Sequence, residues 1–193
     1  MTVDKRSAGE WACIHGDWEK GHMSMFIPDR NSRPKEKEEI VMSEICEFRG
    51  DNYYLSNFYE TPVTYEGITY QNNEAAFQAQ KCLNPKDRIQ FAGMNATEAK
   101  KLGRSVSLRP DWERVKTGIM RAVVHAKFSQ HPELAEKLMA TGNAYLAEGN
   151  TWHDRVWGID ENRNGANLLG IILMEERDTL VKEREYAEED LER

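Results

Sequence analysis

Tyr70-Gln71-Asn72-Asn73-Glu74-Ala75-Ala76-Phe77-Gln78-Ala79-Gln80-Lys81-Cys82 is the most informative stretch of this 193-residue chain. It predicts a short helix capped by Asn72 or Asn73. On this helix Glu74, Gln78 and Lys81 share one face, whereas apolar side chains cover most of the remaining circumference. A helix this apolar is largely buried, and an unpaired buried charge costs roughly several kcal/mol. The polar face therefore follows a solvated seam or lines a cavity, and spacing alone favours the solvated seam.

Short strands and longer helices are expected on both sides of this stretch. Residues 62–70 predict a hairpin that turns at Glu66-Gly67 and leads directly into the helix. We expect further strands at 45–48 and 145–148, and further helices over 97–102 (with Thr97 as cap and Gly103 as left-handed stop), over 110–129, from Pro132 to Gly142, and from Asn167 until the chain leaves the helix in an acidic tail. No β-α-β alternation is visible. The pattern predicts an α+β fold: a compact, predominantly helical single domain with a small antiparallel sheet.

Composition and charge divide the chain into three parts. We expect an N-terminal extension over residues 1–40, the domain over 41–182, and an acidic tail over 183–193. The net charge of −7 gathers near the end, since residues 175–193 carry 4 basic and 9 acidic side chains whereas 41–174 carry 15 and 16. A near-neutral body suits a local basic pocket for a phosphorylated small molecule. It offers no broad footprint for gripping nucleic acid nonspecifically.

The sequence predicts a cytoplasmic protein without a membrane partner. No apolar run approaches the ~20 residues that span a bilayer, and no signal-peptide core follows the first residues. The cysteines Cys13, Cys46 and Cys82 form an odd and sparse set, which argues against a disulfide framework. Cys13 with His15 and His22 gives fewer local ligands than a structural zinc site uses. We therefore expect neither a metal nor a cofactor.

Several common catalytic motifs are missing from the sequence. It contains no P-loop, no G-x-G-x-x-G, no H-E-x-x-H and no G-x-S-x-G. Kinase, dehydrogenase, zinc protease and serine hydrolase functions are therefore without support.

A family resemblance rests on several separated motifs that keep their order. They are Leu55-Ser56-Asn57-Phe58, the helix at 73–81, Leu108-Arg109-Pro110-Asp111-Trp112 with Val115-Lys116, Trp152-His153-Asp154-Arg155-Val156-Trp157-Gly158, and Asn167-Leu168-Leu169-Gly170. Together they resemble the YbiA-like family, also called NADAR for its association with NAD and ADP-ribose metabolism. The resemblance runs from about Phe48 to Leu180. It departs from the family pattern at Ala75, where a bulkier residue is frequent, and at His153, where Asn is common.

The resemblance implies an N-glycosidase that acts on ribosides. Cleaving a ribosyl C–N bond builds positive charge on the sugar, requires a protonated or stabilised leaving base, and needs water directed at the anomeric carbon. Glu74 matches the acidic residue of the family motif, so we assign it electrostatic stabilisation or acid–base work. Lys81 is expected to bind phosphate, to act on the ribose, or to form a Schiff base with the opened sugar.

The other motifs complete the predicted site. Trp157 offers a flat face for a base, and Asp154 is a third catalytic candidate, for the ribose hydroxyls or for water. Core packing of Trp157 and turn capping by Asp154 are the simpler explanations for these residues. Asn167 either caps the last helix or lies beside a phosphate that is bound by the free N–H groups at the start of that helix. The remaining predicted substrate-binding residues are Ser56, Asn57, Phe58, Gln78 and Gly158.

Two substrate types are implied by the resemblance. One is an early phosphorylated intermediate of riboflavin synthesis, and the other is ADP-ribose attached to guanine, either free or in modified DNA whose base is flipped into the pocket. The charge distribution favours a small molecule. One alternative is a noncatalytic module that binds ADP-ribose or a related nucleotide. Another is a purely structural interaction domain, which predicts that Glu74 and Trp157 lie far apart.

Overall fold

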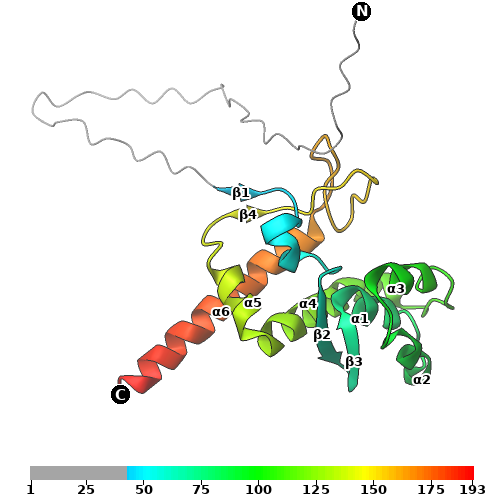
Figure 1. The fold of residues 1–193 in the computed structure, drawn as a ribbon, viewed down its shortest axis with the longest axis horizontal. Coiled ribbons are helices and arrows are strands. Elements are labelled where there is room, and N and C mark those ends of the chain that lie inside the picture. Colours follow the sequence, from blue (N-terminus) through cyan, green and yellow to red (C-terminus); the bar gives the residue numbers. More distant parts are fainter. Residues whose placement is uncertain (1–42) are drawn as a thin grey trace, which may run out of the picture. The chain divides into compact units, whose positions relative to one another are not determined.

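The computed structural model describes residues 43–193, so the predicted extension over 1–40 and the Cys13, His15 and His22 set lie outside the described residues. In chain order the elements are β1 (Glu44–Ile45), the 3-10 helix η1 (Gly50–Leu55), β2 (Glu60–Tyr65), β3 (Ile68–Asn72), α1 (Asn73–Ala79), α2 (Pro85–Arg88), the 3-10 helix η2 (Ile89–Phe91), α3 (Ala96–Leu102), α4 (Trp112–Gln130), α5 (Pro132–Met139), β4 (Tyr145–Leu146) and α6 (Leu168–Leu191). Figure 1 shows these helices with two small pairs of strands. The predicted α+β class with a helical majority is confirmed.

The predicted hairpin is formed by β2 and β3. The two strands are antiparallel, and Tyr65 pairs with Ile68 across the turn. Glu66 and Gly67 both have positive φ, 51° and 76°, as a two-residue hairpin of the type I′ kind requires. Val63 and Tyr70 are fully buried on one face. The hairpin therefore enters the core and carries the chain straight into α1.

Helix α1 begins as predicted and ends earlier than predicted. The Asn72 side chain accepts a hydrogen bond from the Ala75 N–H at 2.8 Å, which makes Asn72 the cap. All seven residues of the helix are buried. After Ala79 the backbone tightens to i→i+3 bonds, so Lys81 lies in the turn that follows the helix rather than on its face.

Helix α3 has a different cap from the expected one. Asn95, and not Thr97, accepts from the Glu98 N–H, and the Glu98 side chain returns a bond to the Asn95 N–H in a capping box. Gly103 has a φ of −61°, so the expected left-handed stop was wrong. A Cβ at Gly103 would lie 1.9 Å from Gln78 Oε1. Close packing, and not backbone freedom, therefore explains this glycine.

A second pair of strands lies at the start of α6. β1 and β4 are parallel, with Ile45 opposite Leu146, and both are shorter than the predicted strands. Figure 1 shows this pair beside the N-terminal end of α6, away from the β2–β3 hairpin. The sheet content is thus one antiparallel and one parallel pair among the described residues.

The core consists of two apolar clusters that meet at α1. Phe77 belongs to the cluster built with α4, α5 and α6, whereas Ala75, Ala76 and Ala79 belong to the cluster of the hairpin and α3. α1 packs against β3, α3 and α4. Because all residues of α1 are buried, its polar residues do not form the solvated face that spacing alone favoured.

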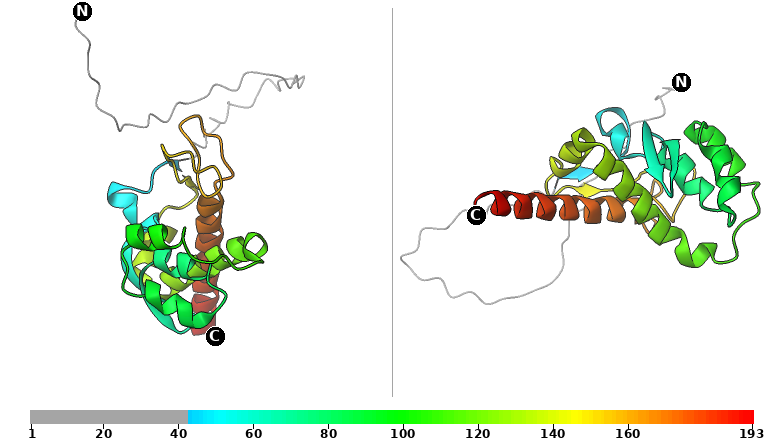
Figure 2. Two further views of the ribbon diagram at one scale, coloured as in Figure 1. Left: turned by 90° about the vertical axis from the view of Figure 1, so that its right-hand side faces the viewer. Right: turned by 90° about the horizontal axis from the view of Figure 1, so that it is seen from below.

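Helix α6 continues through the acidic tail. The sequence was expected to leave the helix near residue 183, but α6 runs to Leu191. Residues 182–193 are exposed, and Figure 2 shows this end extending away from the other described elements. Among residues 43–193, none of the helices combines the length and the apolar character needed to cross a membrane.

Candidate active site

One cavity of about 700 Å³ collects most of the predicted site residues. Its walls come from the segment around η1, from α1 with the turn after it, from α3, from α4 and from the loop after β4. The lining residues are Phe48, Arg49, Tyr53, Ser56, Asn57, Phe58, Glu74, Phe77, Gln78, Lys81, Lys100, Arg104, Trp112, Lys116, Met120, Glu148, Gly149, Trp152, Asp154, Val156 and Trp157. Glu74 and Trp157 thus line the same space, contrary to the expectation for a purely structural interaction domain.

The predicted residues divide into a large group in the lining and a small group beside it. Those in the lining are Ser56, Asn57, Phe58, Glu74, Gln78, Lys81, Asp154 and Trp157. Gly158 and Asn167 are not among the lining residues. The Asn167 side chain donates to Leu146 O at 2.8 Å and to the Tyr145 hydroxyl at 3.1 Å, so it ties α6 to β4 and does not cap the helix.

Glu74 is an acid sheltered at the start of α1. Its side chain is buried, and the Gln78 Nε2 donates to Glu74 Oε1 at 2.8 Å. The Glu74 N–H donates to Asn57 O at 3.0 Å, which joins α1 to the Leu55-Ser56-Asn57-Phe58 turn. Burial raises the pKa of Glu74, while the charges of Lys100 and Lys81 and the Gln78 hydrogen bond act in the opposite direction.

Lys81 reaches the cavity from the turn after α1. Its Nζ donates to Gly103 O at 2.9 Å and lies 5.8 Å from the centre of the Trp112 ring. Burial lowers the pKa of Lys81, and the nearby charge of Glu74 opposes that change. The protonated form of this lysine can bind a phosphate, and its lowered pKa makes the neutral amine more accessible for reaction with a sugar aldehyde.

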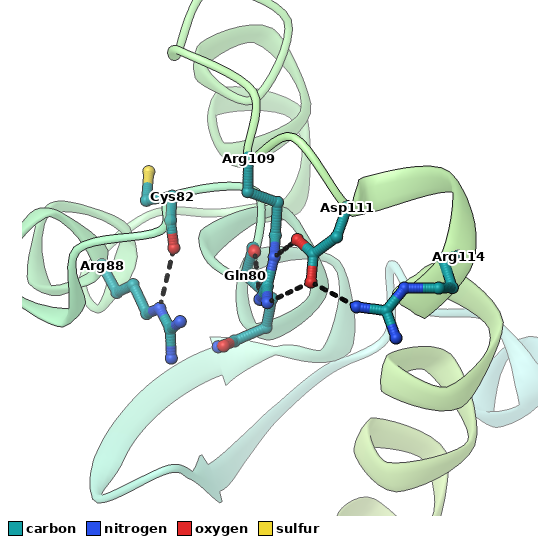
Figure 3. Close-up of polar contacts among 6 residues, drawn as sticks. All are labelled: Gln80, Cys82, Arg88, Arg109, Asp111 and Arg114. Atoms are coloured by element: carbon teal, nitrogen blue, oxygen red, sulfur yellow. Dashed lines mark hydrogen bonds and ion pairs between the residues drawn. The ribbon is translucent and has the colours of Figure 1, made fainter.

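Two arginines fix the backbone that carries Lys81. The Arg109 N–H donates to Lys81 O at 2.9 Å, and Arg109 Nη1 reaches Gln80 O at 3.5 Å. On the other side, Arg88 Nε donates to Cys82 O at 3.1 Å. Figure 3 shows the two guanidinium groups on either side of this short segment. The turn therefore keeps its shape without being part of a helix.

Arg109 is itself held by the residue before α4. Its Nε and Nη2 donate to the two Asp111 carboxylate oxygens at 2.6 and 3.1 Å, a two-pronged geometry that suits guanidinium and carboxylate. Figure 3 also shows Arg114 on the outer side of Asp111. The pair links the start of α4 to the turn that presents Lys81.

Asp154 caps a turn and also borders the cavity. Asp154 Oδ1 accepts from the N–H groups of Val156 and Trp157, both at 3.0 Å, so the residue caps the turn before Trp157. It also lines the cavity beside Glu74. Trp157 likewise packs on the core and forms part of the cavity wall.

An aromatic wall is formed by Phe58, Phe77, Trp112 and Trp157, which all line the cavity. The Phe77 ring is 5.1 Å from Trp112 and 5.3 Å from Trp157, centroid to centroid, and the contact with Trp157 is edge to face. Phe58 stands under Lys100, whose Nζ is 5.2 Å from the centre of the ring. These rings present flat faces on which a base can stack.

The sequence analysis missed Glu148, Lys100 and Arg104, which also line the cavity. Burial, with the charges of Asp154 and Glu74, raises the pKa of Glu148 to about 7. Lys100 and Arg104 are four residues apart on and just after α3, and that spacing is a signal that could have been used. Nothing local marks Glu148, because it follows a two-residue strand and its neighbours in the cavity come from distant segments.

The cavity is lined by side chains of three chemical kinds. They are carboxyl groups, basic side chains and aromatic rings. In the part of the chain from 43 to 193 no group of three His, Cys, Asp or Glu side chains is placed to hold a metal ion.

Comparisons with known proteins identify relatives in a single family. The family model described as the NADAR domain matches residues 46–181. The chain is 38% identical over 158 residues to the N-glycosidase YbiA of Shigella flexneri serotype 5b, covering 79% of this chain and 98% of that protein. It is 34% identical over 137 residues to the riboflavin biosynthesis protein VVA0006 of Vibrio vulnificus, covering 69% of this chain and 37% of that protein. The NMR structure of Escherichia coli YbiA matches with a TM-score of 0.67 at 37% identity, over 79% of this chain and 94% of that one.

Proposed function

This chain belongs to the NADAR family and is an N-glycosidase, and we propose that it hydrolyses the C–N glycosidic bond of a phosphorylated riboside. The observation that carries the proposal is the position of Glu74, a buried carboxyl group in the same cavity as an aromatic wall and several basic side chains. Each of these three features meets one chemical demand of the reaction.

The acids meet the demand of the sugar. As the C–N bond breaks, its electron pair goes to the base nitrogen and positive charge grows on the ribose. Glu74 as a carboxylate stabilises that charge, and it or Asp154 takes a proton from the water that attacks C1′. The base leaves with a proton, and the products are a free ribose hydroxyl and the base. Water is the only co-reactant.

The basic side chains meet the demand of the phosphate. Lys100, Arg104 and Lys116 come from α3, the turn after it and α4, and all three line the cavity. A phosphate between them would be held by charge and by hydrogen bonds. This assigns the phosphate to these residues rather than to the N-terminus of α6, where Asn167 is occupied with β4.

The aromatic wall meets the demand of the base. Trp112 and Trp157 flank Phe77, and stacking of a base on such a ring contributes about 1–3 kcal/mol in single-stranded nucleic-acid binders. A cavity of about 700 Å³ accommodates a nucleotide-sized ligand.

We favour a small-molecule substrate, such as a phosphorylated intermediate of riboflavin synthesis. A relative carries the name riboflavin biosynthesis protein, and the near-neutral body of this chain gives no broad surface for DNA. ADP-ribose linked to guanine is the second candidate, and it offers the same ribose, phosphate and base. A cytoplasmic location is part of the same proposal.

The test is a base-release assay with both substrate types. Purified protein is incubated with the phosphorylated ribosides and, as matched controls, with the same ribosides lacking phosphate, and free base is measured by chromatography. We expect release from a phosphorylated riboside and a KM at least about tenfold higher for its dephosphorylated form. If these compounds bind but no base is released, the protein is a noncatalytic binding module and the enzyme proposal fails.

A second assay decides the role of Lys81. Borohydride is added during turnover, and the protein is analysed by mass spectrometry. An adduct on Lys81 that is lost in Lys81→Arg would establish an imine to the opened sugar, whereas turnover without an adduct would leave Lys81 as a binding and electrostatic group.

A further inference from the structure

We propose that Glu148 is the acid that protonates the departing base, which makes it a further catalytic residue of this site. The inference rests on the proposed function and deepens it. It starts from geometry: Glu148 lines the cavity together with Glu74 and Asp154, although the three residues come from separate segments of the chain.

The backbone of Glu148 is fixed from several sides. Its N–H donates to Asn167 Oδ1 at 3.1 Å, and its carbonyl accepts from the Ile159 N–H at 3.0 Å. Gly158 packs so tightly here that a Cβ would lie 2.1 Å from the Glu148 carbonyl oxygen. The two predicted site residues that do not line the cavity, Gly158 and Asn167, therefore both position Glu148.

The surrounding charges favour the protonated form of Glu148. Two carboxyl groups, Asp154 and Glu74, act against its ionisation, and Lys100 acts in favour. The other charged groups that line the cavity are Arg49 before η1, Lys81 after α1, Arg104 after α3 and Lys116 on α4. Burial and the two acids prevail, because the pKa of Glu148 is raised to about 7. Near neutral pH a substantial share of the protein therefore carries a proton on this side chain.

Glu74 and Glu148 differ in what supports their charge. Burial and the charge of Asp154 raise the pKa of Glu74, whereas Lys100, the Gln78 hydrogen bond and Lys81 favour its carboxylate. At Glu148 only one of those two lysines contributes, and two neighbouring acids oppose it. Paired carboxyl groups in unlike surroundings commonly divide into a proton donor and an anion.

The proposed step is balanced within one turnover. The O–H bond of the Glu148 acid breaks as its proton joins the base nitrogen that leaves C1′ with the bonding electron pair. Water then forms the new C1′–O bond and gives a proton to the carboxylate of Glu74. Release of that proton to solvent and uptake of one by Glu148 restore the resting state.

The experiment compares two leaving groups in wild type and Glu148→Gln. One substrate is the phosphorylated riboside found in the base-release assay, and the other is p-nitrophenyl ribofuranoside 5-phosphate, whose leaving group departs without protonation. We expect Glu148→Gln to lower kcat/KM on the order of 10²–10⁴-fold for the natural base. For the nitrophenyl substrate we expect a decrease of less than about tenfold, because general-acid help is not needed there.

Three controls separate catalysis from folding. Glu148→Asp keeps a carboxyl group and should recover part of the lost activity toward the natural base. Glu161→Gln removes an exposed acid from the same loop and should leave both substrates unaffected. In wild type, activity toward the natural base should fall as pH rises through about 7, and this fall should be absent in Glu148→Gln.

The opposing outcomes are distinct from one another. Equal losses on both substrates would show that Glu148 only supports the structure, and unchanged activity would show that it takes no part; either result overturns the inference while the proposed function stands. If wild type releases base from no riboside, the proposed function fails and the role of Glu148 falls with it.

Discussion

Gly103 lies against the Gln78 side chain, where a methyl group would collide with the amide. An added Cβ would lie 1.9 Å from Gln78 Oε1 and 2.7 Å from its Cδ. We therefore expect Gly103→Ala to push Gln78 off Glu74 and to lower kcat/KM about tenfold or more, since small misplacements in a site have large kinetic effects. Base-release kinetics and a thermal melt measure the two consequences.

Gly118 supplies the matched control for that substitution. It is exposed within α4, and a Cβ there meets nothing within 4 Å. Gly118→Ala should leave kinetics unchanged and stabilise the fold by roughly 0.5–1 kcal/mol, because glycine is unfavourable inside a helix. Loss of activity in both variants, or in neither, would contradict the role given to Gly103.

The raised pKa of Glu148 leads to a prediction about the stability of the fold. Its folded pKa of about 7 lies above the ordinary value of 4.5 for a glutamate, so its favourable contribution is complete below pH 4.5 and is lost as pH rises through about 7. At pH 8 the folded protein holds a charged Glu148 beside two other acids. Glu148→Gln removes that charge and should melt at a higher temperature than wild type at pH 8.

The same comparison at pH 5 provides the check. There Glu148 is protonated in the folded protein, so the difference in melting temperature between Glu148→Gln and wild type should largely disappear. An equal difference at both pH values, or a lower melting temperature at pH 8, would contradict the pKa shift. Scanning fluorimetry over this pH range measures it.

The turn between α1 and α2 depends on an arginine from the segment before α4. Arg109 reaches Gln80 O and is held by both oxygens of Asp111, as Figure 3 shows. We expect Arg109→Met to loosen the turn that carries Lys81 and to lower kcat/KM about tenfold. Arg109→Lys should recover little, because a single ammonium group does not reproduce the two-pronged contact.

Arg114 is the control at this junction. It touches the same Asp111 from the outside at 3.4 Å, and its side chain is 80% exposed. Arg114→Ala should change activity by less than about twofold, as exposed ion pairs contribute little. If the substitutions at Arg109 and Arg114 have equal effects, the junction does not act through the turn.

At the level of elements, the sequence predicted what local chemistry specifies. The Glu66-Gly67 turn, alternating strands and the Asn72 cap gave the hairpin and the start of α1, and the structure agrees. The predicted cap of α3 was wrong. Thr97 and Asn95 both have side chains that can cap a helix, and only the reciprocal hydrogen bonds with Glu98 identify Asn95 as the cap. Spacing also could not tell that the polar residues of α1 line a cavity, because that depends on what packs around the helix.

A further prediction concerns the exposed C-terminal end of α6. Residues 183–193 are exposed, and the salt bridge from Arg184 to Glu136 joins side chains that are 48% and 66% exposed. A protein ending at Lys182 should keep its base-release kinetics and melt within about 2 °C of the full chain, because exposed residues contribute little stability. A loss of activity, or a drop of many degrees, would show that the acidic part of α6 belongs to the domain.

The cavity is a property of the entire domain, which limits how much of it a sequence reveals. Its walls come from residues near 48–58, 74–81, 100–120 and 148–157, and no local pattern states that these segments meet. The family resemblance pointed to Glu74, Lys81, Asp154 and Trp157 through motifs. It did not reach Glu148, Lys100 or Arg104, whose significance arises only when distant carboxyl groups and cations are brought together.

The proposal for the whole molecule depends on a buried carboxylate that stabilises a developing sugar cation. It is tested by measuring both base release and ligand affinity for wild type and Glu74→Gln, which keeps the size of the side chain. We expect Glu74→Gln to bind the phosphorylated riboside within about tenfold of wild type and to release base at least on the order of 10²-fold more slowly. Base release at the wild-type rate by Glu74→Gln would contradict the account.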